Sequence, residues 1–144
     1  VEKNDNIFDR IIADCLTYNA ALQLYQDKYD LALLTLERAI RSGLAVEETY
    51  LLHAMALRHL GSDAKSNEEA LRSLDLAVER RTAGSRFINS ERGLLYLRLG
   101  DFNKAQAAFD AYLGDLSRMK ADDHWDEIDW GRKMLARCKL LLSK

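Results

Sequence analysis

Three stretches of this chain superpose on one another without gaps. In each of them a small residue is followed four positions later by a large apolar one. These pairs are Ala32 and Leu36, Ala70 and Leu74, and Ala105 and Phe109. Residues four apart lie on one face of an α-helix, so each pair sets a small side chain beside a large one on a surface suited to close packing. The sequence therefore predicts three equivalent helices of a repeat protein, at residues 29–40, 67–78 and 102–113.

A second amphipathic stretch precedes each of these helices. The three upstream stretches are residues 14–27, 48–60 and 86–99. Gly61 and Gly100 are expected to end the last two, and Asp101 is expected to cap the helix that follows. Ser66 and Glu69 have the spacing of a capping box and predict the start of another helix. Each unit is therefore expected to be a helical hairpin.

The composition supports long helices. The chain of 144 residues has no proline and only seven glycines, whereas turn-rich β-folds use both. Hydrophobic residues make up 48% and charged residues 31%, which excludes a disordered chain. The formal net charge of −2 provides no basic field of the kind that attracts nucleic acid.

Residues 86–113 resemble a tetratricopeptide repeat (TPR), whose first helix carries Gly-x-x-Tyr and whose second carries Ala-x-x-x-Phe. Gly93 and Tyr96 match the first motif, and Ala105 and Phe109 match the second. The small residues let two helices approach, and the rings fill the space that remains. The resemblance implies an all-α, right-handed TPR-like superhelix of antiparallel helix hairpins. It implies one domain over residues 1–144, with repeats at approximately 13–46, 47–84 and 86–119.

The first two repeats match the TPR pattern less closely. In the second, Tyr50 takes the large aromatic position, Ala54 the small one and Leu57 the tyrosine position, and residues 62–66 lengthen the turn.

In the first repeat two registers are available. Ala21 with Leu24 is favoured over Ala20 with Gln23, because the second register would bury a glutamine.

Two segments flank the repeats. Apolar residues Ile7, Phe8, Ile11 and Ile12 predict either an upstream extension of the first helix or a short helix of their own. Residues 123–143, with Asp123 as their cap, are expected to form a C-terminal capping helix, since a solenoid needs its last apolar face covered. Seven or eight helices are expected in total.

No pattern of reactive residues indicates an enzyme, a cofactor or a metal site. The spacing typical of metal ligands is absent between the three histidines, His53, His59 and His124, and the two cysteines. We interpret both cysteines, Cys15 and Cys138, as core residues. The acidic run at residues 122–129 lacks the spacing of a calcium loop and suits the first turn of a helix. A row of arginines either steers an acidic partner or solvates its surface, with solvation favoured: Arg80, Arg81, Arg86, Arg92 and Arg98.

The TPR resemblance also implies a peptide-binding groove lined by the first helix of each repeat. By aligned position its wall would consist of Tyr18, Leu22 and Tyr25, then Leu51, Met55, Arg58 and His59, then Phe87, Ser90, Leu94 and Arg98. This wall is apolar and aromatic with a basic edge. It does not match the TPR type that grips chaperone carboxylates, whose Lys, Asn and Arg positions are occupied here by Tyr18, Leu22, Leu52, Phe87 and Glu91. We therefore expect an apolar peptide or an amphipathic partner helix in the groove.

An alternative is a structural, capping or oligomerisation module of a larger protein, such as an envelope-assembly lipoprotein or the TPR appendix of a hydrolase, with the groove filled by its own terminal helix. An oligomer is possible in either case. No apolar run is long enough to span a bilayer, so a soluble chain is expected. Because it starts at Val1 rather than Met, it could be a trimmed or processed product, which leaves a cytoplasmic or a periplasmic location open.

Overall fold

The computed structural model describes residues 7–43, 45–80, 85–119 and 124–144, which form seven α-helices and no strand within these ranges. The all-α prediction is confirmed. The helices group into two compact units, residues 1–84 and 85–144, and each is described by itself. A single domain and a TPR superhelix stay predictions. Within the described ranges, no helix combines the length and the apolar character needed to cross a membrane.

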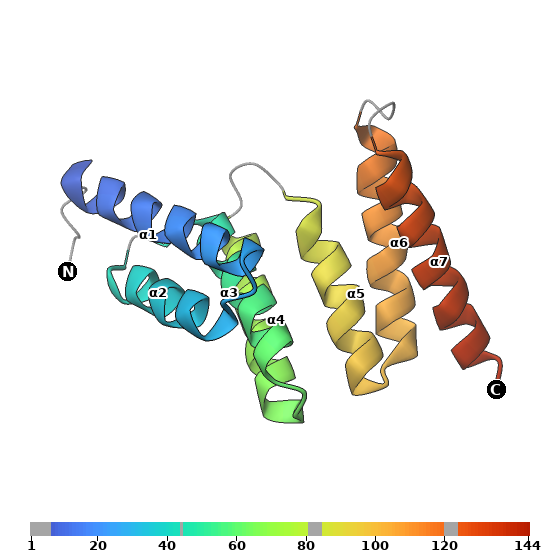
Figure 1. The fold of residues 1–144 in the computed structure, drawn as a ribbon. Helices are drawn as coiled ribbons and strands as arrows, with labels where there is room; N and C mark the ends of the chain where they lie inside the picture. Colours follow the sequence, from blue (N-terminus) through green and yellow to red (C-terminus); the bar gives the residue numbers. More distant parts are fainter. Residues whose placement is uncertain (1–6, 44, 81–84, 120–123) are drawn as a thin grey trace. The chain divides into compact units, whose positions relative to one another are not determined.

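The first unit contains four helices in two consecutive hairpins (Figure 1). They are α1 (Ile7–Tyr25), α2 (Tyr29–Arg41), α3 (Glu47–Leu60) and α4 (Ala64–Glu79). Each packs against the next in the chain, and α1 also reaches α3. The predicted extension of the first helix is therefore correct, since α1 is continuous from Ile7.

The core of this unit corrects the register of the first repeat. Ala20 is fully buried together with Leu36, Leu52 and Ala56, whereas Ala21 is half-buried at the edge of this cluster. The prediction that placed Ala21 at the small position is wrong. The Ala20 register was expected to bury a glutamine, and it does. Oε1 of Gln23 is buried without a hydrogen-bond partner. The close approach of α1 to α2 and α3 outweighs that one polar atom.

The start of α4 also differs from the prediction. The helix begins at Ala64, and the N-cap is Asp63, whose Oδ1 accepts a hydrogen bond of 2.7 Å from the amide of Ser66. Ser66 therefore lies in the first turn, and the predicted capping box with Glu69 is wrong. Asp63 and Ser66 both have side chains that can cap a helix, and Asp63, which comes first in the chain, is the N-cap.

A buried histidine in this unit predicts a pH effect on stability. His53 shares a hydrogen bond of 2.6 Å with Oγ of Ser73. Burial lowers its pKa below the ordinary value of 6.5, against the opposing influence of Glu69 and Glu37. The unfolded chain therefore binds a proton more readily than the folded one, so this contribution to stability is complete above pH 6.5 and is lost as the pH falls below it.

Urea unfolding at a series of pH values checks this. We expect the midpoint to fall more steeply below pH 6.5 in the wild type than in His53→Gln, which cannot take up a proton. Parallel curves for the two proteins would contradict the prediction.

The second unit contains three helices, α5 (Phe87–Leu99), α6 (Phe102–Arg118) and α7 (Trp125–Leu142), with α6 packed against both others. The turn between α5 and α6 has the predicted caps. Gly100 has the left-handed φ of 79°, and Oδ1 of Asp101 accepts a hydrogen bond from the amide of Lys104. The capping helix predicted at 123–143 corresponds to α7, and Asp123 lies outside the described residues.

Phe109 of α6 is the centre of this unit. It is fully buried with Ala105 and with Cys138 of α7, and the ring of Trp130 meets it edge to face at 5.6 Å. Gly93 of α5 lies directly against the Phe109 ring. The small and large positions of the predicted motif therefore pack on each other, as their spacing indicated.

Candidate protein-binding surface

Helix α1 carries its largest apolar side chains on its exposed side. Tyr25 is 89% exposed and Tyr18 65%, whereas Ala13, Thr17 and Ala20 are buried. A surface helix of a globular protein normally buries its large apolar residues instead. Large exposed apolar faces are typical of surfaces that contact another molecule, which makes this face the candidate site.

Six residues of this face alternate in spacing between three and four. We call them the α1 seam: Phe8, Ile11, Cys15, Tyr18, Leu22 and Tyr25. Phe8 is 69%, Ile11 51% and Leu22 43% exposed, and Cys15 is exposed as well. The mean spacing of about 3.5 is that of the positions through which helices of a coiled coil contact one another. A shallow depression of about 420 Å³ lies over the middle of the seam, beside Ile11, Cys15 and Tyr18.

The opposite side of α1 is fixed to α3 by two threonines. Oγ1 of Thr17 donates to the carbonyl of Ala13 at 2.9 Å and lies 2.9 Å from Oγ1 of Thr49. Since the hydroxyl proton of Thr17 is used, that of Thr49 is the one shared between them. Thr49 in turn accepts a hydrogen bond from the amide of Val46. This buried chain of hydrogen bonds fixes the rotation of α1 and keeps the seam outward.

The predicted groove residues of the first repeat, Tyr18, Leu22 and Tyr25, all belong to the seam and are exposed. Phe8, Ile11 and Cys15 lie on the same face, although the family alignment does not place them in the groove. The signal that could have identified them is the seven-residue periodicity from Phe8 to Tyr25, separate from the stripe of small residues at Ala13, Thr17 and Ala20.

The predicted residues of the second repeat are only partly accessible. Leu51 is buried, and Met55 is half-buried against the cluster around Leu36. His59 is exposed, and its ring stacks on that of Tyr29 at 4.3 Å. Arg58, beside it, is half-buried. Of these four residues, Leu51 does not offer a contact surface, and the others offer only part of their side chains.

The predicted residues of the third repeat lie in the second unit. Phe87 is 39% exposed, with the guanidinium of Arg86 above its ring at 4.2 Å. Ser90 is buried and donates to the carbonyl of Phe87. Leu94 is half-buried against the Phe109 cluster, and Arg98 is exposed. Of these four, Phe87 offers the largest apolar contact area.

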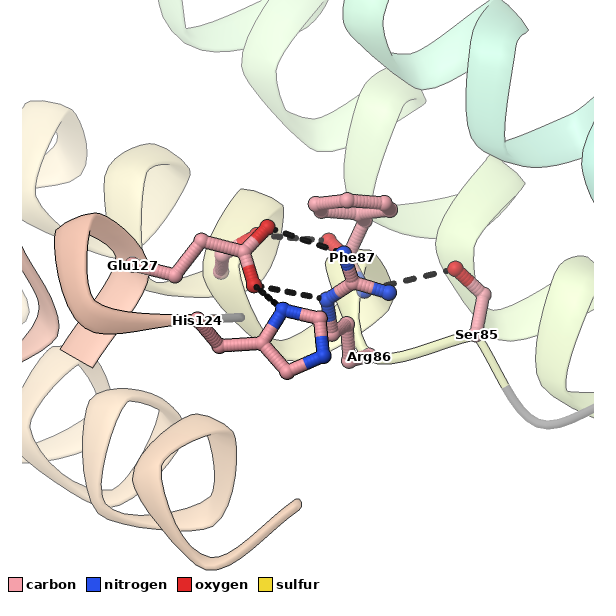
Figure 2. Close-up of polar contacts among 6 residues, drawn as sticks. Ser85, Arg86, Phe87, His124 and Glu127 are labelled. Atoms are coloured by element: carbon pink, nitrogen blue, oxygen red, sulfur yellow. Dashed lines mark hydrogen bonds and ion pairs between the residues drawn. The ribbon is translucent and has the colours of Figure 1, made fainter. Parts of the chain in front are cut away.

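Arg86 is engaged within its own unit (Figure 2). Its guanidinium donates two hydrogen bonds of 2.9 Å to the two carboxylate oxygens of Glu127, near the start of α7. Nδ1 of His124 lies 3.4 Å from one of these oxygens. The paired carboxylate raises the pKa of Arg86. A bidentate pair of this kind fixes the start of α7 to the start of α5, so Arg86 has a structural role.

A further arginine of the predicted row contacts an aromatic ring. Arg80 lies over the ring of Tyr50, with its guanidinium 5.0 Å from the ring centre. Arg81 lies outside the described residues. Because Arg86 is bound to Glu127 and Arg80 lies over Tyr50, these two arginines do not contribute to a free basic row.

The residues considered for metal or thiol chemistry are described in part. Among the described residues no group of three or more His, Cys, Asp or Glu could hold a metal ion. Asp122 and Asp123 of the acidic run lie outside them. Cys138 is buried, as predicted, and burial raises the pKa of its thiol. The prediction that Cys15 is also a core residue is wrong, because Cys15 is exposed in the seam.

Comparison with known proteins gives the chain no family. No protein-family model matches the sequence. No curated protein matches it either.

Proposed function

We propose that this chain is a non-catalytic, TPR-like protein-binding module that holds an apolar or amphipathic helix of another polypeptide. Its principal contact surface is the α1 seam. The observation that carries the proposal is the exposure of Tyr18, Leu22 and Tyr25 on a helix that the Thr17 and Thr49 hydrogen bonds hold in place. A surface that is both apolar and preorganised loses little conformational entropy when it binds.

The type of ligand follows from the spacing of the seam. Apolar residues at intervals of three and four present a straight stripe, which matches the stripe of another amphipathic helix. Helix α1 has one basic residue, Arg10, and two acidic ones, Asp9 and Asp14, so the face lacks the rows of Lys and Arg that attract anionic lipids. A protein helix is therefore the ligand that fits.

The resemblance to TPR proteins supports the same class of function. Gly93 against Phe109 is the contact that the family motif requires, and hairpins packed in series are the family's building units.

The structural alternative draws on a different observation. Trp130, Met134 and Leu135 of α7 pack against the cluster around Phe109. Helix α7 thus serves the core of its own unit, which is the role of a cap in a larger assembly.

Selection from a displayed library of random peptides tests the binding function. We expect the immobilised chain to enrich peptides with apolar residues at intervals of three and four. The double variant Tyr18→Glu and Leu22→Glu should reduce their affinity at least about thirtyfold, the loss expected when central anchors of an interface are removed.

The matched control is Leu140→Glu, which places the same charge on an exposed apolar residue of α7. This variant should retain the peptides, and all variants should keep the helical circular dichroism of the wild type. Failure to enrich any peptide, or equal binding by the Tyr18→Glu and Leu22→Glu variant, would argue against the proposed function and favour the structural alternative.

A further inference from the structure

The α1 seam has a self-complementary order of side chains. Read in reverse, Phe8 meets Tyr25, Ile11 meets Leu22, and Cys15 meets Tyr18. An antiparallel pair of these helices would therefore set an aromatic against an aromatic at both ends. It would set the small Cys15 against the large Tyr18 twice at the centre. A parallel pair would instead place Tyr18 against Tyr18 and leave a gap between two cysteines, and gaps of this kind cost packing energy.

The charges on α1 favour the same orientation. The three charged residues of α1 are Asp9, Arg10 and Asp14, which all lie in its first half and give it a net charge of −1, and residues 15–25 carry no charge. An antiparallel pair places each acidic half beside an uncharged one and opposes the two helix dipoles. A parallel pair brings the like charges together and aligns the dipoles.

The exposed area suits a stable dimer. Aromatic side chains bury about 150–250 Å² each when they are fully covered, and Phe8, Tyr18 and Tyr25 are mostly exposed. With the aliphatic residues of the seam and the exposed Ile7 and Ile12 beside it, α1 offers on the order of 800 Å². That is about the area each partner contributes to a standard protein interface.

We propose that the partner of the α1 seam is the α1 seam of a second copy of this chain, packed antiparallel about a two-fold axis between Cys15 and Tyr18. This inference rests on the proposed function, because it names the helix that the surface binds. A two-fold interface uses the same patch on both copies, which the reversed order of the seam satisfies.

Sedimentation velocity over a wide range of concentrations tests the dimer. The wild type is expected to sediment at twice the 16.5 kDa mass of one chain. Tyr18→Glu should weaken dimerisation at least about thirtyfold, since it buries two unpaired charges near the axis. Leu140→Glu should remain dimeric. A wild type that is monomeric throughout, or a Tyr18→Glu variant that stays dimeric, would overturn the inference.

Engineered disulfides test the orientation. In a Cys15→Ser background, a mixture of Phe8→Cys and Tyr25→Cys chains should form a disulfide between the two variants, and neither should crosslink to itself. Self-crosslinking of each variant would show a parallel pair and overturn the proposed arrangement. The native Cys138 is buried and should not react.

The two proposals can fail separately. A monomeric chain that binds selected peptides through Tyr18 and Leu22 would overturn the dimer and leave the binding function standing. A dimer that Tyr18→Glu dissociates, with no peptide enriched, would support the inference and argue against other ligands.

Discussion

Replacing Phe109 by alanine is expected to lower the free energy of unfolding of the second unit by about 3–5 kcal/mol, the range found when a fully buried aromatic residue is truncated in a core. Phe109 has no exposed surface and joins all three helices of that unit, through Gly93 of α5, Ala105 of α6 and Cys138 of α7. Its edge-to-face contact with Trp130 adds to the loss. Because the Phe109 side chain is enclosed by three helices that pack on one another, the cavity should collapse only in part.

Chemical unfolding followed by the fluorescence of Trp130 and Trp125 measures this change, since both tryptophans lie in the affected unit. Phe87→Ala is the matched control, because it removes the same ring from a half-exposed position in that unit. We expect the control to lose no more than about 1.5 kcal/mol, the upper value for a partly covered side chain with one cation–π contact. Similar losses for the two variants would mean that Phe109 does not organise the core.

The helices could be predicted from the sequence because their signals are local. A small residue four positions before a large one repeats three times, and each repeat corresponds to a helix in the structure. The turn at Gly100 and Asp101 was predictable for the same reason. A glycine that takes a left-handed φ and an aspartate that caps the next helix need no distant contact to specify them.

The register of the first repeat depends on tertiary packing. The choice between Ala20 and Ala21 turned on avoiding a buried glutamine, a cost of about 1–3 kcal/mol for one unsatisfied atom. Oε1 of Gln23 is nevertheless buried without a hydrogen-bond partner. The packing of Ala20 against Leu36, Leu52 and Ala56 in the core stabilises the fold by more than this unsatisfied atom costs. The local penalty can be estimated from the sequence, whereas the size of the packing gain depends on contacts among three helices.

The candidate surface was predictable only in part, because its residues were placed by family alignment. One position along a helix is a rotation of about 100°, so a small error in alignment moves a residue from the exposed to the buried face. Tyr18, Leu22 and Tyr25 proved exposed, whereas Leu51 and Ser90 proved buried. The periodicity of α1 itself, with large apolar and small residues on separate faces, is a physical signal that does not depend on the alignment.

Gly93 and Phe109 should show strong energetic coupling. A Cβ atom on Gly93 would lie 2.5 Å from Cζ of Phe109 and 2.7 Å from Cδ1, much closer than such atoms can approach. Overpacking a core costs about 1–3 kcal/mol. Alanine in place of glycine inside a helix stabilises the helix by about 1 kcal/mol, because alanine has the higher helix propensity. The cost of the clash should exceed the gain in helix propensity, because the Phe109 ring is fully buried and cannot move aside. Gly93→Ala is therefore expected to destabilise the second unit.

In the Phe109→Ala background the sign of the Gly93→Ala effect should reverse. With the ring removed, the new methyl group enters the cavity without a clash, and only the helix-propensity gain of about 1 kcal/mol remains. The helix-propensity gain is common to both backgrounds, so the double-mutant cycle should give a coupling free energy equal to the clash, on the order of 1–3 kcal/mol, measured by chemical unfolding of the four proteins. Gly114→Ala is the matched control, because its methyl group would meet only the end of Arg118 at 3.9 Å, and it should be neutral or stabilising in both backgrounds. Additive effects of Gly93→Ala and Phe109→Ala would mean that the two motif positions do not pack on each other in solution, which would remove the main physical support for the TPR-like interpretation.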